Sequence, residues 1–174
     1  MNVTDFEQLI LAHGKSVYGF ICKMTGNPMD AEDFYQQTFL KAFEMLDEIE
    51  SEQYPKAFLI SIFLGLYRNK RRKEGRHNRI APTIAITEDN QESLASDVNL
   101  EVEFIKREES EMVMKCVSLL DEKFRIPILL HYNAQLSVEE IANVIKKPVG
   151  TVKTRLKRGR ELIKKGLEEA GYEQ

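Results

Sequence analysis

Apolar residues recur in this chain three or four positions apart, which is the spacing of helices rather than strands. One apolar face near the N-terminus comprises Phe6, Leu9, Ile10, His13, Val17, Ile21 and Met24. Gly26 ends this helix, and Asn27 can cap the next one, with Pro28 at its first position. We expect the second predicted helix to bury Tyr35, Phe39, Ala42, Phe43 and Leu46.

The opposite face of that second helix is polar and carries Asp33, Gln36, Gln37, Lys41 and Glu44. After a polar loop at residues 47–55, a third helix is apolar almost all round from Phe58 to Leu66, which indicates burial on several sides. It then turns abruptly basic, and Gly75 marks its predicted end. We expect these helices to form one domain over residues 1–78.

Helical periodicity disappears after this domain. Pro82 opens a segment whose charges are all acidic: Glu88, Asp89, Glu92, Asp97, Glu101 and Glu103. A structureless stretch of this length is unusual inside one compact domain. We therefore expect residues 79–104 to be an acidic, flexible linker.

The pattern predicts a second helical domain over residues 105–174. Its first apolar stripe holds Ile105, Met112, Val113, Cys116, Val117 and Leu120, and a further apolar helix covers Phe124 to Tyr132. Pro127 must either lie in the first turn of that helix or kink it. The predicted fold class is thus all-α, with two small helical domains joined by the linker.

The end of the chain has the pattern of a helix-turn-helix. Ser137 and Glu140 form a capping box before a short apolar helix, and residues 146–148 form a turn. Lys146 stands where many such turns have glycine, at a cost of roughly 1 kcal/mol for a left-handed conformation. The final helix has an inward apolar side of Val149, Val152, Leu156 and Ile163 and an outward side of Lys153, Thr154, Lys157 and Arg158. Such outward side chains can reach base edges in a major groove.

The charge distribution predicts two contacts with nucleic acid. Sixteen of the 25 basic residues lie in two stretches, 68–79 and 146–165, although the 174-residue chain has a net charge of −3. Phosphates attract these stretches and repel the acidic remainder. A solvated basic surface helix is the simpler alternative for the second stretch, but the capped partner helix and tight turn argue against it.

The remaining composition excludes several classes of protein. A hydrophobic fraction of 43% with 30% charged residues is typical of a globular protein. Cys22 and Cys116 lie in apolar stripes as small buried hydrophobes, and the three histidines lack metal-binding spacing, so we expect no metal and no cofactor. There is no signal peptide, and the longest apolar run is too short for a bilayer, which predicts a cytoplasmic protein.

Three segments together resemble the extracytoplasmic-function class of bacterial sigma factors. Residues 30–39 resemble that family's acidic, glutamine-bearing motif in the promoter-melting domain. Residues 58–76 resemble its segment for recognising and opening the −10 element, and residues 123–160 its −35-reading domain. The resemblance covers the whole chain apart from the linker, and the order and spacing of the motifs make it strong.

This resemblance implies a promoter-specificity subunit and not an enzyme. The partners it implies are the clamp helices and flap of core RNA polymerase, promoter DNA and an anti-sigma factor, with no small-molecule substrate.

The resemblance also implies which residues make these contacts. Residues that would bind core polymerase are Asp33, Gln36 and Gln37. The −10 contact would use Tyr67, Arg68, Asn69, Arg71, Arg72 and Arg76, with Phe63 and Tyr67 equally interpretable as core residues. The −35 contact would use Lys153, Thr154, Lys157 and Arg158 on base edges, and Arg155 and Arg160 on phosphate. The linker would occupy the RNA path of polymerase.

Two other functions remain open at the level of sequence. A stand-alone helix-turn-helix repressor or activator would bind duplex DNA by itself, usually as a dimer. A nuclease could use Asp30, Glu32 and Asp33 as a magnesium site, but acids in the first turn of a capped helix already have an explanation in the helix dipole.

Overall fold

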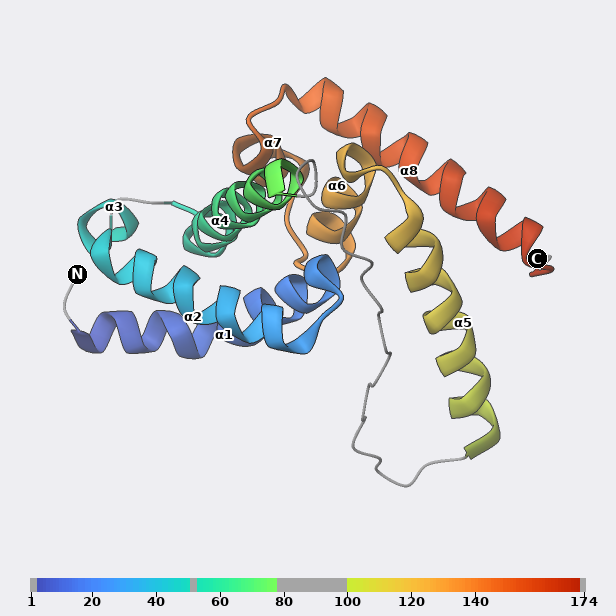
Figure 1. Cartoon of the computed structure of the whole chain (residues 1–174), viewed down its shortest axis with the longest axis horizontal. Helices are drawn as coiled ribbons and strands as arrows, with labels where there is room; N and C mark the ends of the chain where they lie inside the picture. The colour runs from blue at the N-terminus through green and yellow to red at the C-terminus, as the bar shows by residue number, and fades with distance from the viewer. Residues whose placement is uncertain (1–2, 51–52, 78–99, 173–174) are drawn as a thin grey trace.

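The computed structural model describes residues 3–50, 53–77 and 100–172, and all their regular structure is helical. In chain order the elements are α1 (Val3–Thr25), α2 (Pro28–Glu44), α3 (Leu46–Glu50), α4 (Pro55–His77), α5 (Leu100–Leu119), α6 (Glu122–Tyr132), α7 (Val138–Ile145) and α8 (Val149–Glu169). This confirms the predicted all-α fold class (Figure 1). No described helix is long and apolar enough to cross a membrane.

The N-terminal helices pack around an aromatic core. α2 lies against both α1 and α4, and the rings of Phe20 and Phe34 each meet Phe63 edge-on, with centroids 5.8 and 5.4 Å apart. Asn27 caps α2 as predicted, because its Oδ1 accepts hydrogen bonds from the backbone amides of Met29 and Asp30. These contacts fix the start of α2 beside the basic end of α4.

Three details of this half differ from the sequence-based predictions. Phe43 is 45% exposed, because its ring packs over Phe6 at the edge of the core rather than inside it. The predicted polar loop begins with the short helix α3. α4 continues through Gly75 to His77, since nothing crowds Gly75 and a glycine in an exposed helix costs only about 1 kcal/mol.

The C-terminal helices form the predicted helix-turn-helix. Ser137 and Glu140 make the reciprocal capping box at the start of α7, with bonds of 2.8 and 3.1 Å. Lys146 ends α7 in the left-handed conformation, at φ 52° and ψ 52°, as predicted for the turn. Pro127 lies inside α6, beyond its first turn, and is buried.

The two halves of the chain pack against each other. α4 contacts α7, and α1 contacts α6, so a single apolar core runs through both halves (Figure 1). α5 begins at Leu100, and the end of the predicted linker 79–104 is therefore helical. The rest of that linker lies outside the described residues.

Candidate nucleic-acid interface

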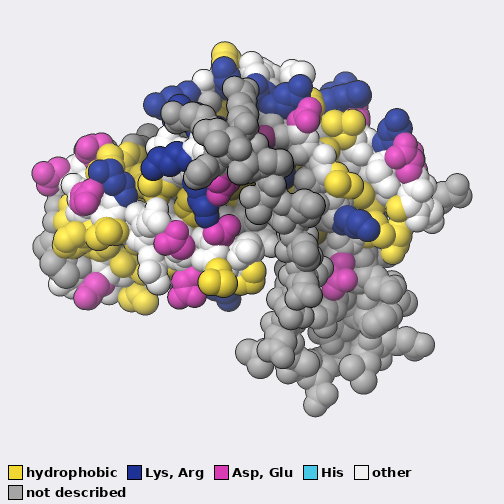
Figure 2. Space-filling view, viewed as in Figure 1, with side chains coloured by type: hydrophobic (Ala, Val, Ile, Leu, Met, Phe, Trp, Pro, Cys, Tyr) yellow, Lys and Arg dark blue, Asp and Glu magenta, His cyan; other side chains and the backbone are white. Residues whose placement is uncertain are grey.

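The outward face of α8 is exposed and cationic. Lys153, Thr154, Lys157 and Arg158 all lie on the exposed side of this helix, while Val152 and Leu156 are buried on the other. Figure 2 shows Lys and Arg side chains gathered along the upper edge of the molecule, where Figure 1 places α7 and α8. The structure thus brings together the four side chains predicted to face base edges.

Several of these side chains have contacts within the chain. The Thr154 hydroxyl donates to the Gly150 carbonyl oxygen at 3.0 Å. Arg158 pairs with Glu161 one turn away, with 3.0 Å between Nη1 and Oε2, and both side chains are about half exposed. An exposed ion pair of this kind contributes little to stability, and another anion, such as a phosphate, can replace Glu161 on Arg158.

Arg160 lies apart from this outward group. Its guanidinium donates to the Tyr132 hydroxyl at 3.2 Å, at the end of α6. Arg155, the other predicted phosphate contact, is partly buried on α8. The two arginines predicted to touch phosphate therefore sit at the sides of the helix rather than on its outermost stripe.

Gly159 seats α8 closely on α6. An added Cβ at this position would lie 2.8 Å from the Cγ1 atom of Ile128, closer than real side chains allow. Gly159 is buried with Val152 and Leu156, so it belongs to the inward side of α8. The close approach sets how far the outward residues stand from the body of the domain.

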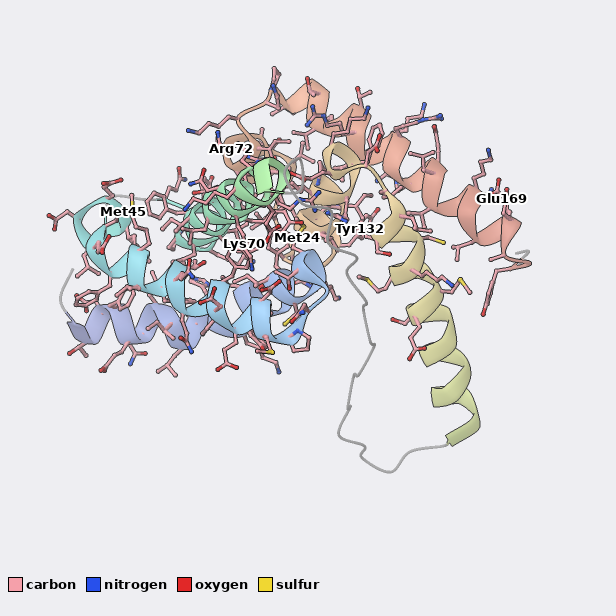
Figure 3. All side chains as sticks on the ribbon, viewed as in Figure 1. Met24, Met45, Lys70, Arg72, Tyr132 and Glu169 are labelled. Atoms are coloured by element: carbon pink, nitrogen blue, oxygen red, sulfur yellow. The ribbon has the colours of Figure 1, made fainter. Side chains whose placement is uncertain are left out.

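The basic end of α4 is held by partners within the molecule. Lys70 Nζ lies 2.6 Å from Asp30 Oδ1 on α2 and 5.2 Å from the centre of the Phe34 ring. The hydrogen bond to Asp30 raises the pKa of Lys70, so the ammonium stays charged at any physiological pH. Lys70 and Arg72 are labelled on α4 in Figure 3.

The other cations of this segment also have partners. Arg68 Nε lies 3.9 Å from Glu122 Oε1 at the start of α6. Arg71 donates to the Tyr67 hydroxyl at 3.3 Å and lies over the Tyr67 ring. Arg72 donates to the Asn69 side-chain oxygen. The side chain of Arg76 lies outside the part of the structure that is described.

Both aromatic candidates of α4 are core residues. Phe63 is fully buried and Tyr67 is 6% exposed, with the two rings packed 5.7 Å apart. The Tyr67 ring also packs against Phe34. Of the residues predicted for the −10 contact, Tyr67 therefore offers its hydroxyl edge and support for Arg71, not a free stacking face.

The predicted polymerase-binding residues share one exposed face of α2. Asp33, Gln36 and Gln37 are all exposed, and Gln37 donates to Asp33 at 2.8 Å. Leu40 lies on the same face, one turn further along the helix, and is 65% exposed. A single exposed apolar side chain is ordinary on a protein surface, and here it adds apolar area to an otherwise polar face.

Two of the three acids of the alternative magnesium site have other partners. Asp30 pairs with Lys70, and Asp33 accepts a hydrogen bond from Gln37. Among the described residues, no group of three His, Cys, Asp or Glu side chains is arranged to hold a metal.

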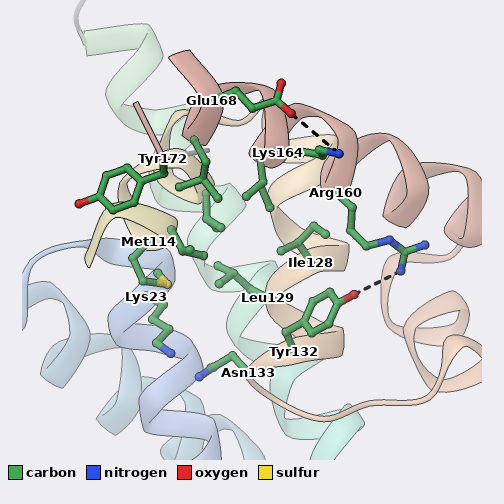
Figure 4. Close-up of a pocket in the computed structure, with 14 residues that line it drawn as sticks. Lys23, Met114, Ile128, Leu129, Tyr132, Asn133, Arg160, Lys164, Glu168 and Tyr172 are labelled. Atoms are coloured by element: carbon green, nitrogen blue, oxygen red, sulfur yellow. Dashed lines mark hydrogen bonds and ion pairs between the residues drawn. The ribbon is translucent and has the colours of Figure 1, made fainter. Parts of the chain in front are cut away.

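An apolar groove of about 680 Å³ lies among α5, α6 and α8 and reaches the end of α1 (Figure 4). We call it the α5–α8 groove. Its apolar lining comprises Val113, Met114, Val117, Ile128, Leu129, Ile163 and Leu167. The charged residues that line the groove are Lys23, Arg160, Lys164 and Glu168.

Sequence reasoning missed three of these features. Glu122 carries no signal of its partnership with Arg68, because the two residues are far apart in the chain. Gly159 gives no sign in the sequence of its close contact with α6. Leu40 could have been found, since it follows Gln36 and Gln37 at helical spacing on the polar face of α2.

Known families match both halves of the chain. The sigma-70 region 2 family matches residues 9–77, and the sigma-70 region 4 family matches residues 110–163. The ECF RNA polymerase sigma factor SigW of Bacillus subtilis is 30% identical over 165 residues, which cover 93% of this chain and 88% of SigW. The ECF sigma-E factor of Escherichia coli is 32% identical over 137 residues, which cover 77% of this chain and 72% of that protein.

Solved structures share the fold. The sigma factor RpoE of Bartonella quintana, in complex with the anti-sigma factor NepR, matches with a TM-score of 0.79 at 24% identity, covering 95% of this chain and 98% of RpoE. CnrH in complex with the cytosolic domain of CnrY matches with a TM-score of 0.68 at 25% identity, covering 97% of this chain and 90% of CnrH.

Proposed function

This chain belongs to the ECF family of RNA polymerase sigma factors, and we propose that it reads one promoter at two places, through α8 and α4. The outward face of α8 would lie in the major groove of the −35 element. Lys153, Thr154, Lys157 and Arg158 would contact base edges, and Arg155 and Arg160 would contact phosphate. The single observation that carries this proposal is the separation of α8 into a buried apolar side and an exposed cationic side.

The basic end of α4 would hold the −10 element. Arg68, Arg71 and Arg72 would bind phosphates, and Asn69 would lie near unstacked bases of the melted strand. Holding bases out of the stack costs a few kcal/mol for each base, which contacts with the protein offset. Exposure of Arg68, Asn69, Arg71 and Arg72 at the surface supports this role.

Core polymerase would bind the protein at two surfaces. The face of α2 that carries Asp33, Gln36 and Gln37 would meet the clamp helices, with Leu40 adding apolar contact. The α5–α8 groove is the surface of the C-terminal half best suited to an apolar element of the flap. Polymerase would supply all covalent chemistry, so the chain itself would catalyse nothing.

An anti-sigma factor would hold the protein inactive. RpoE, which shares this fold, was solved in complex with the anti-sigma factor NepR, and CnrH with the cytosolic domain of CnrY. We infer that this chain also has an anti-sigma factor as a partner. We further infer that it acts in a stress or envelope response, as ECF sigma factors do.

Transcription from defined components tests the function. Purified chain, bacterial core polymerase and a library of promoter fragments are mixed, and the initiated transcripts are sequenced. We expect initiation from a subset of fragments that share two motifs at fixed spacing. Absence of initiation, combined with tight binding of the chain alone to duplex DNA as a dimer, would instead favour a stand-alone repressor.

A further inference from the structure

Two neighbouring lysines form the turn between α7 and α8. Lys146 ends α7, and Lys147 follows it directly before Pro148, the residue that precedes the first turn of α8. Both lysine side chains are exposed, and neither forms an ion pair within the described part of the chain. The proposed −35 contact uses neither of these two charges.

Lys146 holds a backbone conformation that favours glycine. Its φ of 52° and ψ of 52° lie in the left-handed region, where the Cβ of any other residue crowds the following carbonyl. The turn needs this conformation, because it brings the amide of Lys147 to the carbonyl oxygen of Ala142, at 3.1 Å, and so ends α7. A glycine would form the same turn without strain. The fold therefore gives no reason for a lysine at this position, whereas a ligand outside the chain would.

The lysines of the turn extend the cationic face of α8. The first turn of α8 contains no acidic residue, and its exposed side continues with Lys153 and Lys157. The acids of α7, Glu139 and Glu140, lie at the opposite end of that helix, roughly 9 Å from Lys146 along its axis. Figure 2 shows Lys and Arg side chains along the upper edge of the molecule, where Figure 1 places this turn and the start of α8. The positive charge thus begins before the helix does.

Docking of a helix-turn-helix on DNA brings this turn to the edge of the major groove. The second helix lies in the groove and the first crosses the backbone, so the turn between them passes over the phosphates that border the groove. A lysine ammonium is a point charge on a long flexible stem, which suits a phosphate better than a base edge. Contacts of this kind add affinity and fix the position of the protein, but they carry no sequence information.

We propose that Lys146 and Lys147 bind backbone phosphates at the edge of the −35 element, and that Lys146 strengthens DNA binding while it weakens the fold. The inference rests on the proposed function, because it extends the same −35 contact by two residues. The outward side of α8 reads bases, and the turn supplies affinity that does not depend on sequence. Each lysine that neutralises a phosphate releases about one counterion, so the pair contributes about two to the slope of log affinity against log salt concentration.

The salt dependence of promoter binding by assembled holoenzyme measures both contacts. Lys146→Gly and Lys147→Gln each remove one charge, and each should lower the slope by about one, with a similar loss of affinity on every promoter that the holoenzyme binds. Lys115→Gln is the matched control, since it removes an exposed cation from α5, outside the proposed DNA contacts. An unchanged slope in either turn variant, or an equal change in the control, would overturn the proposal.

The stability of the free chain gives a second test, because it should move in the opposite direction from DNA binding. Lys146→Gly removes the left-handed strain, and we expect the folding equilibrium constant from denaturant unfolding to rise about two- to fivefold. Gln135→Gly is the control, because Gln135 is exposed, uncharged and also has a positive φ, of 55°. It should gain stability with no change in the salt slope. Loss of stability together with DNA binding in Lys146→Gly would show that a distorted turn, not a missing charge, weakens binding.

Neutral phosphates locate the contacts on the DNA. A methylphosphonate in place of one phosphate removes the charge from the DNA side of the contact. Wild-type holoenzyme should lose affinity when the neutral group lies at the edge of the −35 element, and Lys146→Gly and Lys147→Gln should each lose less at the position that they contact, because the partner is already missing. Additive losses at every position would contradict the assignment.

The same holoenzyme separates the two levels of the account. Normal initiation with wild-type salt slopes in the turn variants would sink this inference alone. A chain that supports no initiation from any promoter fragment would sink the proposed function instead.

Discussion

The two basic regions of this protein differ in what their cations already contact. On α4, Lys70 pairs with Asp30, Arg68 with Glu122 and Arg71 with Tyr67. On the outward face of α8, Lys153 and Lys157 have no such partner among the described residues, and Arg158 pairs only with a glutamate on its own helix. One region is therefore ready to bind, whereas the other must exchange partners first.

This difference corresponds to the two proposed tasks. Reading a duplex needs a rigid helix whose side chains project from a fixed base, and Gly159 seats α8 closely on α6 for that purpose. Holding single-stranded DNA needs cations near a strand that is already melted. Binding of these cations to DNA before the strands separate would serve no function. The intramolecular partners of α4 keep that region occupied until the strands separate.

The largest expected effect is on the outward face of α8. Replacing Arg158 by alanine should relax base preference at one position of the −35 element, with a loss of about 1–3 kcal/mol of discrimination there. Binding of holoenzyme to promoters with each base substituted in turn measures the change. An equal loss on all promoters would show that Arg158 contacts phosphate and not a base.

The next largest effect is expected at the close contact between α8 and α6. Gly159→Ala drives a methyl group against Ile128, and we expect the free energy of unfolding to fall by about 1–2 kcal/mol, as overpacking of a core does. Gly65→Ala is the matched control, because nothing lies within 4 Å of its added Cβ and alanine should stabilise α4 by about 0.5–1 kcal/mol. Denaturant unfolding of both variants checks the pair, and stabilisation by Gly159→Ala would refute the close contact.

A smaller effect is expected at the partnered end of α4. Asp30→Asn removes the partner of Lys70, and because both side chains are more than a third exposed, the loss in stability should stay below about 1 kcal/mol. The pKa of Lys70 is raised in the folded state, so the stabilisation is complete below its unfolded value and is lost as pH rises through the folded value. The stability difference between wild type and Asp30→Asn should thus be constant at neutral pH and shrink in strongly alkaline solution. A difference that grows with alkalinity would contradict this pairing.

The smallest effect is expected at the exposed end of α8. Lys164→Ala should weaken DNA binding evenly across sequences and lower the slope of log affinity against log salt concentration by about one. Titrations at several salt concentrations measure the slope. A loss confined to one promoter sequence would place Lys164 on a base instead.

Local features of the fold could be predicted from the sequence, and long-range ones could not. The caps at Asn27 and Ser137 and the left-handed Lys146 depend on residues only a few positions apart, and all three are confirmed. Phe43 was wrongly placed in the core, because helical spacing does not show where a core ends.

The candidate site divides in the same way. Periodicity separated the inward and outward sides of α8, since both follow from one helix. It could not find that Glu122 lies beside Arg68 or that Asp30 lies beside Lys70, because these pairs depend on how separate helices pack. Periodicity left open whether Phe63 and Tyr67 are core residues or contacts to DNA bases. Both side chains are buried, so they are core residues.

One measurement tests the central claim that a single promoter is read at two places. Holoenzyme is assembled on a promoter that it initiates from, and about five base pairs, half a helical turn, are inserted between the two elements. We predict that protection of both elements and initiation are lost together, and that both return when the spacing is restored. Undiminished initiation from the lengthened promoter would contradict the account.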